Sequence, residues 1–599
     1  MERQKNRNEV SDLYKWDLTA IYKTDEDWYN DYNKLKDEVC IISKFKGIIT
    51  KDNKTLQEYL DTYTSIDRKL EKLYMYAHLN NDSDTSNTYY QEMKGLIDNL
   101  YNEFSIADSY ANPELLSASY DTILNYIKEN DNLKVYAHTL DNLFRFKNHV
   151  LNDNEEAILT KLSKSLNSSS ETYEFLTDTD MKFGFITNED GKEVELTESN
   201  YNNFIHSSSR SVRESAFSKL LSTYGDFKNT ISSTFSGNIK TLCDLASIKK
   251  YNSSIEASLS NDKIDVKVYN NLIDTVKSNL DVIYRYYDLK KSVLNLDELH
   301  LYDIYLEMVK DLDKEYSFSE AKDLVIKALS VLGDDYVNDL SKAFSQSWID
   351  VYNNVGKRGG AYSSGGYDTY PYVLLNYEGK LKDVSTLAHE LGHSMHSYYS
   401  VKNNKYPNYR YKIFVAEVAS TVNELLLNYY LLNNTEDKNE KLYILNSLME
   451  LYKGTIYRQV MFAEFERDMH AKYEHGEVLT NELLCNEYYK LNKEYFGPNV
   501  VVDDLIKYEW ERIPHFYYDF YVYKYAIGLS CACYIVDGIL NGRENARENY
   551  LKFLSSGGSM YPADELKIAG IDITSSEVVL SAIKMFDKTI EDFKELYNS

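Results

Sequence analysis

The sequence predicts a mainly α-helical protein. Only six prolines and 23 glycines occur among its 599 residues, and the long stretches between them carry apolar residues at intervals of three and four. Hydrophobic residues make up 43% of the chain and charged residues 27%, which is ordinary globular usage. We therefore expect a folded protein with a large helical core.

The first part of the chain is expected to form an N-terminal helical domain. Amphipathic helical patterns cover residues 26–46, 54–78, 86–107, 113–129 and 155–173. A different period begins at Met181, and the turn-forming residues 188–191 lead into a second short apolar stretch, which indicates a β-hairpin. The predicted domains are residues 1–180 (helical), 181–205 (hairpin and connector) and 206–599 (the domain that carries the chemistry).

Helical patterning resumes after the hairpin and is interrupted once more. It covers residues 199–204, 213–240, 266–294 and 319–331. A glycine- and serine-rich loop follows at 357–367, and it has neither the phosphate-binding nor the dinucleotide-binding spacing of glycines. Residues 372–377 are expected to form a strand. Asp383 is then the candidate N-cap of a further helix.

That helix carries a metal-binding pattern, His389-Glu390-Leu-Gly-His393. Histidines four residues apart on a helix can direct their ring nitrogens at one ion, which is why this spacing binds zinc. Glu390 would lie beside the ion without binding it, where its carboxylate can accept a proton from a zinc-activated water. The opposite face is apolar and would pack into the core: Val384, Leu387, Leu391, Met395 and Tyr398.

A third ligand is available on a second predicted helix, at 414–424. Glu417 and Glu424 are seven residues apart and share one face, so only one of them needs to reach the metal. We favour Glu417 as the ligand. Glu424 either orients a ligand or is an exposed or ion-paired glutamate. His396 extends the histidine face, and a packed histidine is favoured there over a fourth ligand, since catalytic zinc keeps a position open for water.

A third segment, residues 515–528, gathers His515 and five tyrosines within eleven positions. Neutral donors of this kind near a metal can hydrogen-bond the oxyanion that develops on an attacked carbonyl. Tyrosine is abundant throughout the chain, with 57 residues in all, so part of this enrichment is background.

These segments together resemble the oligoendopeptidase F group of the thimet oligopeptidase family of zinc peptidases. The resemblance rests on the motif at 389–396, residues 414–424, the loop at 357–365 and the segment 515–528, and it extends to residues 16–18, 553–558 and 562–572. It implies a helical, clam-like, two-lobed zincin with a deep central channel for short unfolded peptides and a small β element beside the active-site helix.

Position by position, the resemblance implies one Zn²⁺ per chain held by His389, His393 and Glu417, with Glu390 as the base. It also implies His515, Tyr518 and Tyr525 as substrate or oxyanion contacts. Because the register of this last group differs from the thimet branch, Tyr517, Tyr521 or Tyr523 are alternatives: each could take the role given to a neighbour. The glycine-rich loop would form a substrate-binding edge.

The net charge and the cysteines indicate which binding partners and which cellular compartment to expect. The net charge of −27 disfavours nucleic acids and anionic membranes, and the polar N-terminus and short apolar stretches favour neither export nor a membrane span. Five scattered cysteines do not suggest a disulfide framework, so a cytoplasmic enzyme is expected. A non-catalytic peptide-binding protein and a zinc hydrolase of a non-peptide amide are the alternatives, and the oligomeric state is left open.

Overall fold

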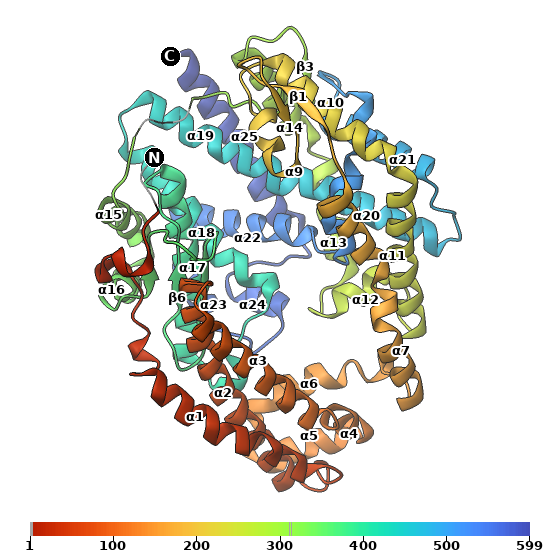
Figure 1. Cartoon of the computed structure of the whole chain (residues 1–599), viewed down its shortest axis with the longest axis vertical. Coiled ribbons are helices and arrows are strands. Elements are labelled where there is room, and N and C mark those ends of the chain that lie inside the picture. The colour runs from red at the N-terminus through yellow and green to blue at the C-terminus, as the bar shows by residue number, and fades with distance from the viewer. Residues whose placement is uncertain (1–3, 311, 313) are drawn as a thin grey trace. The chain divides into compact units, whose positions relative to one another are not determined.

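The computed structural model describes residues 4–310, 312 and 314–599 and is mainly helical, which confirms the predicted fold class (Figure 1). The chain forms two compact units, each assembled from segments that are distant in sequence. Unit 1 comprises Met1–Lys147, Lys314–Tyr430 and Ile535–Gly570. Unit 2 comprises Asn148–Asp313, Leu431–Tyr534 and Ile571–Ser599. The consecutive domains proposed above, 1–180, 181–205 and 206–599, describe a different division and stay a prediction.

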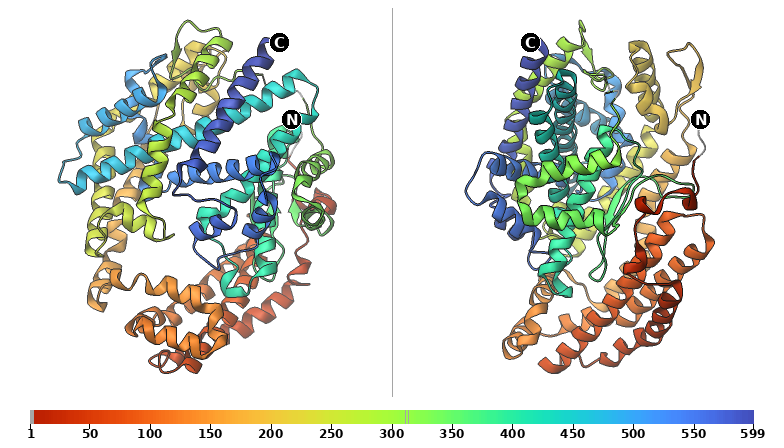
Figure 2. Two further views of the ribbon diagram at one scale, coloured as in Figure 1. Left: turned by 180° about the vertical axis from the view of Figure 1, so that it is seen from behind. Right: turned by 90° about the vertical axis from the view of Figure 1, so that its left-hand side faces the viewer.

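The first part of unit 1 is a bundle of helices around one apolar core. The helices α1–α3 lie side by side in red and orange in both figures (Figures 1 and 2). Trp28, Leu70 and Ile97, one from each of these helices, are completely buried, and the indole of Trp28 donates to the carbonyl of Leu73 at 2.9 Å. The bundle consists of α1 (Asp25–Glu38), α2 (Asn53–Ser83), α3 (Thr88–Asp108), α4 (Ala111–Ser117), α5 (Tyr120–Glu129) and α6 (Ala137–Phe144).

The rest of unit 1 places a small sheet beside a long helix. The strands β4 (Ile349–Asp350), β5 (Tyr362–Ser364) and β6 (Tyr372–Leu374) form a sheet in the order β4-β6-β5, with β5 antiparallel to β6 at the edge. β5 and β6 pack against α17 (Leu381–Asn403), which confirms the expected β element beside that helix. The remaining helices are α15 (Phe318–Leu329), α16 (Asp334–Ser345), α23 (Ala546–Leu554), α24 (Pro562–Ile568) and the first part of α18 (Ile413–Asn434).

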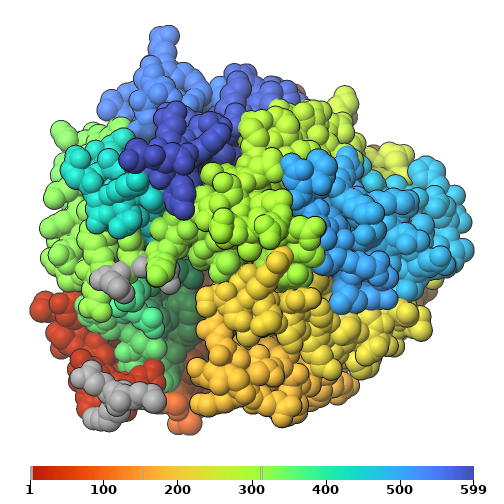
Figure 3. Space-filling view, turned by 90° about the horizontal axis from the view of Figure 1, so that it is seen from above, coloured from red at the N-terminus to blue at the C-terminus, as the bar shows by residue number. Residues whose placement is uncertain are grey.

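Unit 2 is also helical, and its core is rich in aromatic rings. Phe235, Phe465, Trp510 and Phe516 are buried and contact one another. The blue surface of α21 and the following turns lies directly beside the yellow and yellow-green surface of the earlier segments (Figure 3). The helices are α7 (Asp153–Leu166), α8 (Ser168–Glu174), α9 (Glu198–Ile205), α10 (Arg210–Asp226), α11 (Lys228–Ile248), α12 (Ser254–Ser260), α13 (Val266–Lys277), α14 (Leu280–Val293), α19 (Lys438–Tyr452), α20 (Arg458–Glu474), α21 (Asn481–Phe496), the first part of α22 (Tyr523–Leu540) and α25 (Ser576–Asn598).

The hairpin predicted near residue 190 is present in unit 2. Its strands β1 (Phe185–Thr187) and β2 (Glu193–Glu195) pair antiparallel, and Gly191 adopts a φ of 75° in the turn between them, a conformation that glycine reaches without strain. A second, two-residue ladder pairs β3 (Leu299–His300) with β7 (Val500–Val501) in parallel.

Several local expectations are wrong in detail. The stretches 155–173, 213–240 and 266–294 each divide into two helices. The stretch 113–129 is two helices, because the hydroxyl of Ser119 accepts from the N–H of Thr122 and starts α5 anew. Asp383 is not the N-cap of α17, which begins at Leu381. Instead, the Asp383 carboxylate accepts from the N–H groups of Glu378 (3.0 Å) and Lys380 (2.9 Å), so it stabilises the helix start from within the first turn.

The cysteines are free thiols, as expected. Cys40 is exposed and the other four are buried. Cys531 and Cys533 lie completely buried in α22 (Tyr523–Leu540), where they act as small apolar side chains. Over the described part of the chain, no helix combines the length and the apolar character that crossing a bilayer requires.

Candidate metal centre

The helix α17 presents one face to the core and the other to the candidate site. Val384, Leu387, Leu391 and Met395 are completely buried. The side chains of His389 and His393, on the opposite face, keep 26% and 18% of their exposure. The amphipathic pattern therefore fixes which way the two imidazoles point.

A close helix crossing brings α18 to these histidines. A Cβ on Gly392 would lie 2.5 Å from the Cα of Ser420 and 2.6 Å from the carbonyl oxygen of Ala419, so any larger residue would force the two helices apart. The buried amide of Asn423 ties the crossing, since it donates to the Ala388 carbonyl at 3.1 Å. The glycine inside the motif is thus what allows α18 to reach the site.

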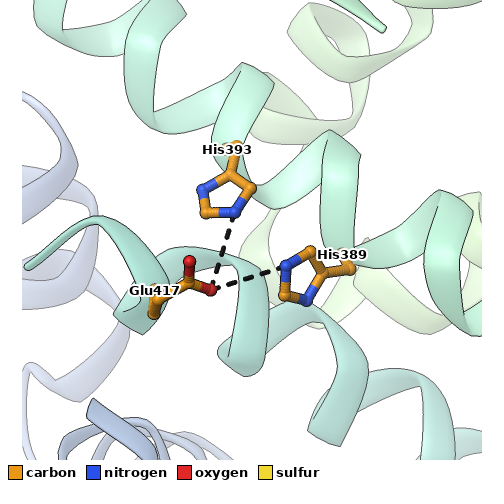
Figure 4. Close-up of side chains that lie close together, drawn as sticks. All are labelled: His389, His393 and Glu417. Atoms are coloured by element: carbon orange, nitrogen blue, oxygen red, sulfur yellow. Dashed lines mark ion pairs between the residues drawn. The ribbon is translucent and has the colours of Figure 1, made fainter. Parts of the chain in front are cut away.

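The crossing places Glu417 against both imidazoles, as Figure 4 shows (Figure 4). Its Oε2 lies 3.5 Å from Nε2 of His389 and 3.7 Å from Nε2 of His393, and the hydroxyl of Ser420 donates to the same oxygen at 3.1 Å. One ligand atom from each of these three residues lies within 4.8 Å of the others. Two imidazoles and one carboxylate are a donor set that suits catalytic zinc, with room for a water.

Each imidazole has an orienting partner on α18. Glu424 Oε2 lies 3.4 Å from Nδ1 of His389, and His393 is hydrogen-bonded to the backbone of Ala416. Such partners leave the other ring nitrogen free to face a metal. The Glu424 carboxylate therefore lies on the Nδ1 side of His389, where it is placed to orient that ring.

The protonation of the two histidines differs. Burial lowers the pKa of His389, but Glu424, Glu390 and Glu417 outweigh it and raise the value to about 8. Burial and the neighbouring His389 lower the pKa of His393 to about 4. The excess of carboxylates gives the site the negative charge that a divalent cation would compensate.

Glu390 is buried beside the cluster, with 6% of its surface exposed. Burial raises its pKa to about 7; the nearby His389 lowers it, and Glu417 and Glu424 raise it further. The backbone of Ser363 in β5 is hydrogen-bonded to its carboxylate. A carboxylate with a pKa close to neutral, held in one place, is suited to proton transfer.

His396 is packed, which confirms the interpretation favoured above. It is completely buried, its ring stacks on that of Tyr411 at 3.7 Å, and it also contacts Phe553. Burial lowers its pKa to about 3. A neutral ring enclosed in this way supports the helix and does not join the three-residue cluster.

His515, Tyr518 and Tyr525 lie in unit 2 and form a cluster of their own. The Tyr525 hydroxyl is 3.4 Å from Nε2 of His515, and the Tyr518 ring meets the imidazole edge-on. Tyr518 is half exposed, and burial lowers the pKa of His515. The three residues present neutral donors on one short segment.

The structure separates the alternative tyrosines. Tyr517 donates or accepts a hydrogen bond with Thr234 at 2.9 Å and stacks on Tyr173, and Tyr523 is completely buried. Tyr521 instead stacks on His515 and contacts Tyr525. Tyr521 is therefore the alternative that joins the His515 cluster.

Sequence reasoning did not single out two contributors to the site. Gly392 could have been noticed, because a glycine inside a helix usually has a packing reason. Ser363 gives no sequence signal, because it acts through its backbone.

Comparison with known proteins gives a consistent result. Residues 203–585 match the model of peptidase family M3, and residues 114–183 match that of oligopeptidase F. The chain is 44% identical to oligopeptidase PepF of Bacillus subtilis, over 99% of this chain and 88% of that protein. It is 38% identical to the group B oligopeptidase PepB of Streptococcus agalactiae, over 99% and 98% of the two chains. The solved oligoendopeptidase F of Enterococcus faecium has a TM-score of 0.73 and 35% identity, over 96% of this chain and 99% of that one.

Proposed function

The chain belongs to peptidase family M3 and is a metalloendopeptidase, and from this premise we propose that it is a zinc oligopeptidase that cuts internal bonds of short, unfolded peptides. The observation that carries the proposal is the cluster of His389, His393 and Glu417 beside the buried Glu390. The names of its relatives, which are oligopeptidases, support the substrate class.

Zinc is the proposed metal, one ion per chain, with His389, His393 and Glu417 as its ligands. Two imidazole nitrogens and one carboxylate oxygen suit this borderline ion better than magnesium or calcium, which prefer oxygen ligands. When bound, the ion would supply an electrophile that acidifies water and polarises the peptide carbonyl.

Glu390 is the proposed base. Its carboxylate, fixed by the Ser363 backbone, would accept a proton from the attacking water and then deliver it to the nitrogen of the leaving amine. Burial supports this role, because it raises the pKa of the carboxyl group and so favours uptake of a proton.

The edge strand, the net charge and the cysteines bear on the substrate and the compartment. The edge strand β5, within the glycine-rich loop, is the proposed substrate-binding edge, since an edge strand offers backbone groups to an extended peptide. The net charge of −27 disfavours nucleic acid and anionic membranes as partners. Five free cysteines support the proposed reducing cytoplasm.

The test is digestion of a mixed pool of short peptides by the purified protein, with and without a chelator, beside a folded protein as control substrate. We expect internal fragments from the peptides, none from the folded protein, and loss of cleavage with chelator that added zinc restores. Peptide binding without cleavage would indicate a non-catalytic protein. Cleavage of amides other than peptides alone would indicate a different hydrolase.

We also propose that His515, Tyr518 and Tyr525 contact the substrate or the developing oxyanion. In Tyr525→Phe, kcat should fall about 10²-fold with little change in KM, since one hydrogen-bond donor to the transition state is lost. Tyr517→Phe is the matched control, because its hydroxyl is committed to Thr234. Steady-state kinetics on one peptide checks this, and equal rates for the Tyr525 variant and the wild type would remove Tyr525 from the reaction.

A further inference from the structure

A cavity of about 530 Å³ lies in unit 1, which also contains His389, His393 and Glu417. Its walls come from α17, from Glu71 on α2, from the turn between β5 and β6, and from the segment that follows α17. The volume is within the range of ligand pockets, about 300–1,000 Å³. The apolar part of the wall consists of Tyr370, Pro371, Tyr398, Val401, Tyr409 and Tyr411.

One side of α17 extends from Glu390 to this cavity. Glu390, Ser394, Ser397 and Val401 are spaced by four, three and four residues, which places them on one side of the helix. Ser397 and Val401 line the cavity, and Glu390 is the proposed base at the other end. The cavity therefore lies on the same side of the helix as the reaction.

The β5–β6 hairpin covers this side of α17. The hydroxyls of Ser363 and Ser394 are 2.8 Å apart, and Ser394 also donates to the Pro371 carbonyl at 3.4 Å. At the turn, a Cβ on Gly365 would lie 2.8 Å from the Cα of Pro371, so the hairpin is closed tightly there. An extended peptide that follows β5 from Glu390 would pass this cavity.

The spacing gives the position of the cavity relative to the cleaved bond. Ser397 is seven residues beyond Glu390, a rise of about 10 Å along the helix. An extended peptide advances about 3.3 Å per residue. The mouth of the cavity thus corresponds to a side chain about three residues from the cleaved bond.

The wall is fixed, and its charges are paired. Tyr411 stacks on His396 at 3.7 Å, and its hydroxyl lies 2.9 Å from that of Ser397. Arg410 is held by the buried Glu71, and Lys402 lies 3.0 Å from Asp339. Aromatic faces with neutralised charges suit an apolar side chain better than a charged one.

We propose that this cavity is a specificity subsite that binds an aromatic or large apolar side chain of the peptide, about three residues from the bond that is cut. The subsite rests on the proposed peptidase function and names a class of its substrates: oligopeptides long enough to reach the cavity and aromatic at that position.

The test fills the cavity with Val401→Trp and uses Asn403→Trp, on the exposed surface of the same helix, as the matched control. Two peptide series differ only in having phenylalanine or alanine at each position around one cleaved bond. The wild type should cut the phenylalanine peptide at least about tenfold better, in kcat/KM, at one position about three residues away. Val401→Trp should abolish that preference without slowing the alanine peptides, and Asn403→Trp should keep it.

If Val401→Trp lowered kcat/KM equally for the phenylalanine and the alanine peptides, or left the preference for phenylalanine unchanged, the proposed subsite would be wrong. If Val401→Trp does not fold, as judged by its thermal unfolding, Val401→Met narrows the cavity less and should reduce the preference in the same selective way.

Binding of the same peptides to Glu390→Gln, with and without Val401→Trp, separates the subsite from the proposed function. Phenylalanine-selective binding that Val401→Trp removes, without any cleavage by the wild type, would support the subsite and contradict the peptidase function. Cleavage by the wild type without selective binding would do the reverse.

Discussion

Replacing Glu390 with glutamine is expected to lower kcat by about 10²- to 10⁴-fold while the zinc content stays at one ion per chain. Glutamine keeps the size of the side chain but cannot accept the proton of the attacking water. Zinc should be retained, because Glu390 lies outside the three-residue cluster that is proposed to bind it. Steady-state kinetics on a single peptide, combined with metal analysis of the purified variant, measures both quantities.

The matched control for this variant is Glu424→Gln, which changes a neighbouring carboxylate that contacts Nδ1 of His389. We expect its kcat to fall much less than that of Glu390→Gln at saturating zinc. Cleavage by Glu390→Gln at the rate of the wild type would show that another group moves the proton.

The second large effect is expected from Glu417→Ala, which should lose bound zinc and, with it, all measurable cleavage. Glu417 supplies the one carboxylate of the three-residue cluster, and two imidazoles alone hold the ion weakly. Glu424→Ala should instead bind zinc about 10- to 100-fold more weakly, because it removes only the partner of a ligand. Zinc titration of the chelator-treated proteins distinguishes the two.

Activity in excess zinc provides a further comparison between these variants. Glu424→Ala should recover most of its activity when zinc is added, whereas Glu417→Ala should not. The reverse outcome would exchange the roles proposed for the two glutamates.

The pair His389 and His393 illustrates what could be predicted from the sequence. Their spacing of four residues and the apolar pattern around them predict a helix with both rings on one face, and α17 has this arrangement. This holds because helix periodicity is a local property of the chain. The mainly helical fold and the hairpin near residue 190 were predictable for the same reason.

The sequence alone did not decide which of Glu417 and Glu424 contacts both histidines. Both are on one face of α18, and a local pattern cannot say which of them meets the imidazoles. The tertiary structure places Glu417 against both Nε2 atoms and Glu424 against Nδ1 of His389, because the crossing at Gly392 sets the height of α18 along α17.

The sequence alone also could not decide which tyrosines of residues 515–525 lie around His515. Their order in the sequence does not distinguish Tyr517, which is hydrogen-bonded to Thr234, and Tyr523, which is completely buried, from the tyrosines that surround His515: Tyr518, Tyr521 and Tyr525.

By itself, the sequence determined the helices, the face on which the motif lies and the types of side chain available to a metal. Only the tertiary structure decided which carboxylate meets the histidines, which backbone holds Glu390 and where a cavity opens along α17. These features depend on contacts between residues far apart in the chain, such as Ser363 with Glu390 and Gly392 with Ser420. The physical reason is that periodicity fixes directions within one element, whereas packing fixes distances between elements.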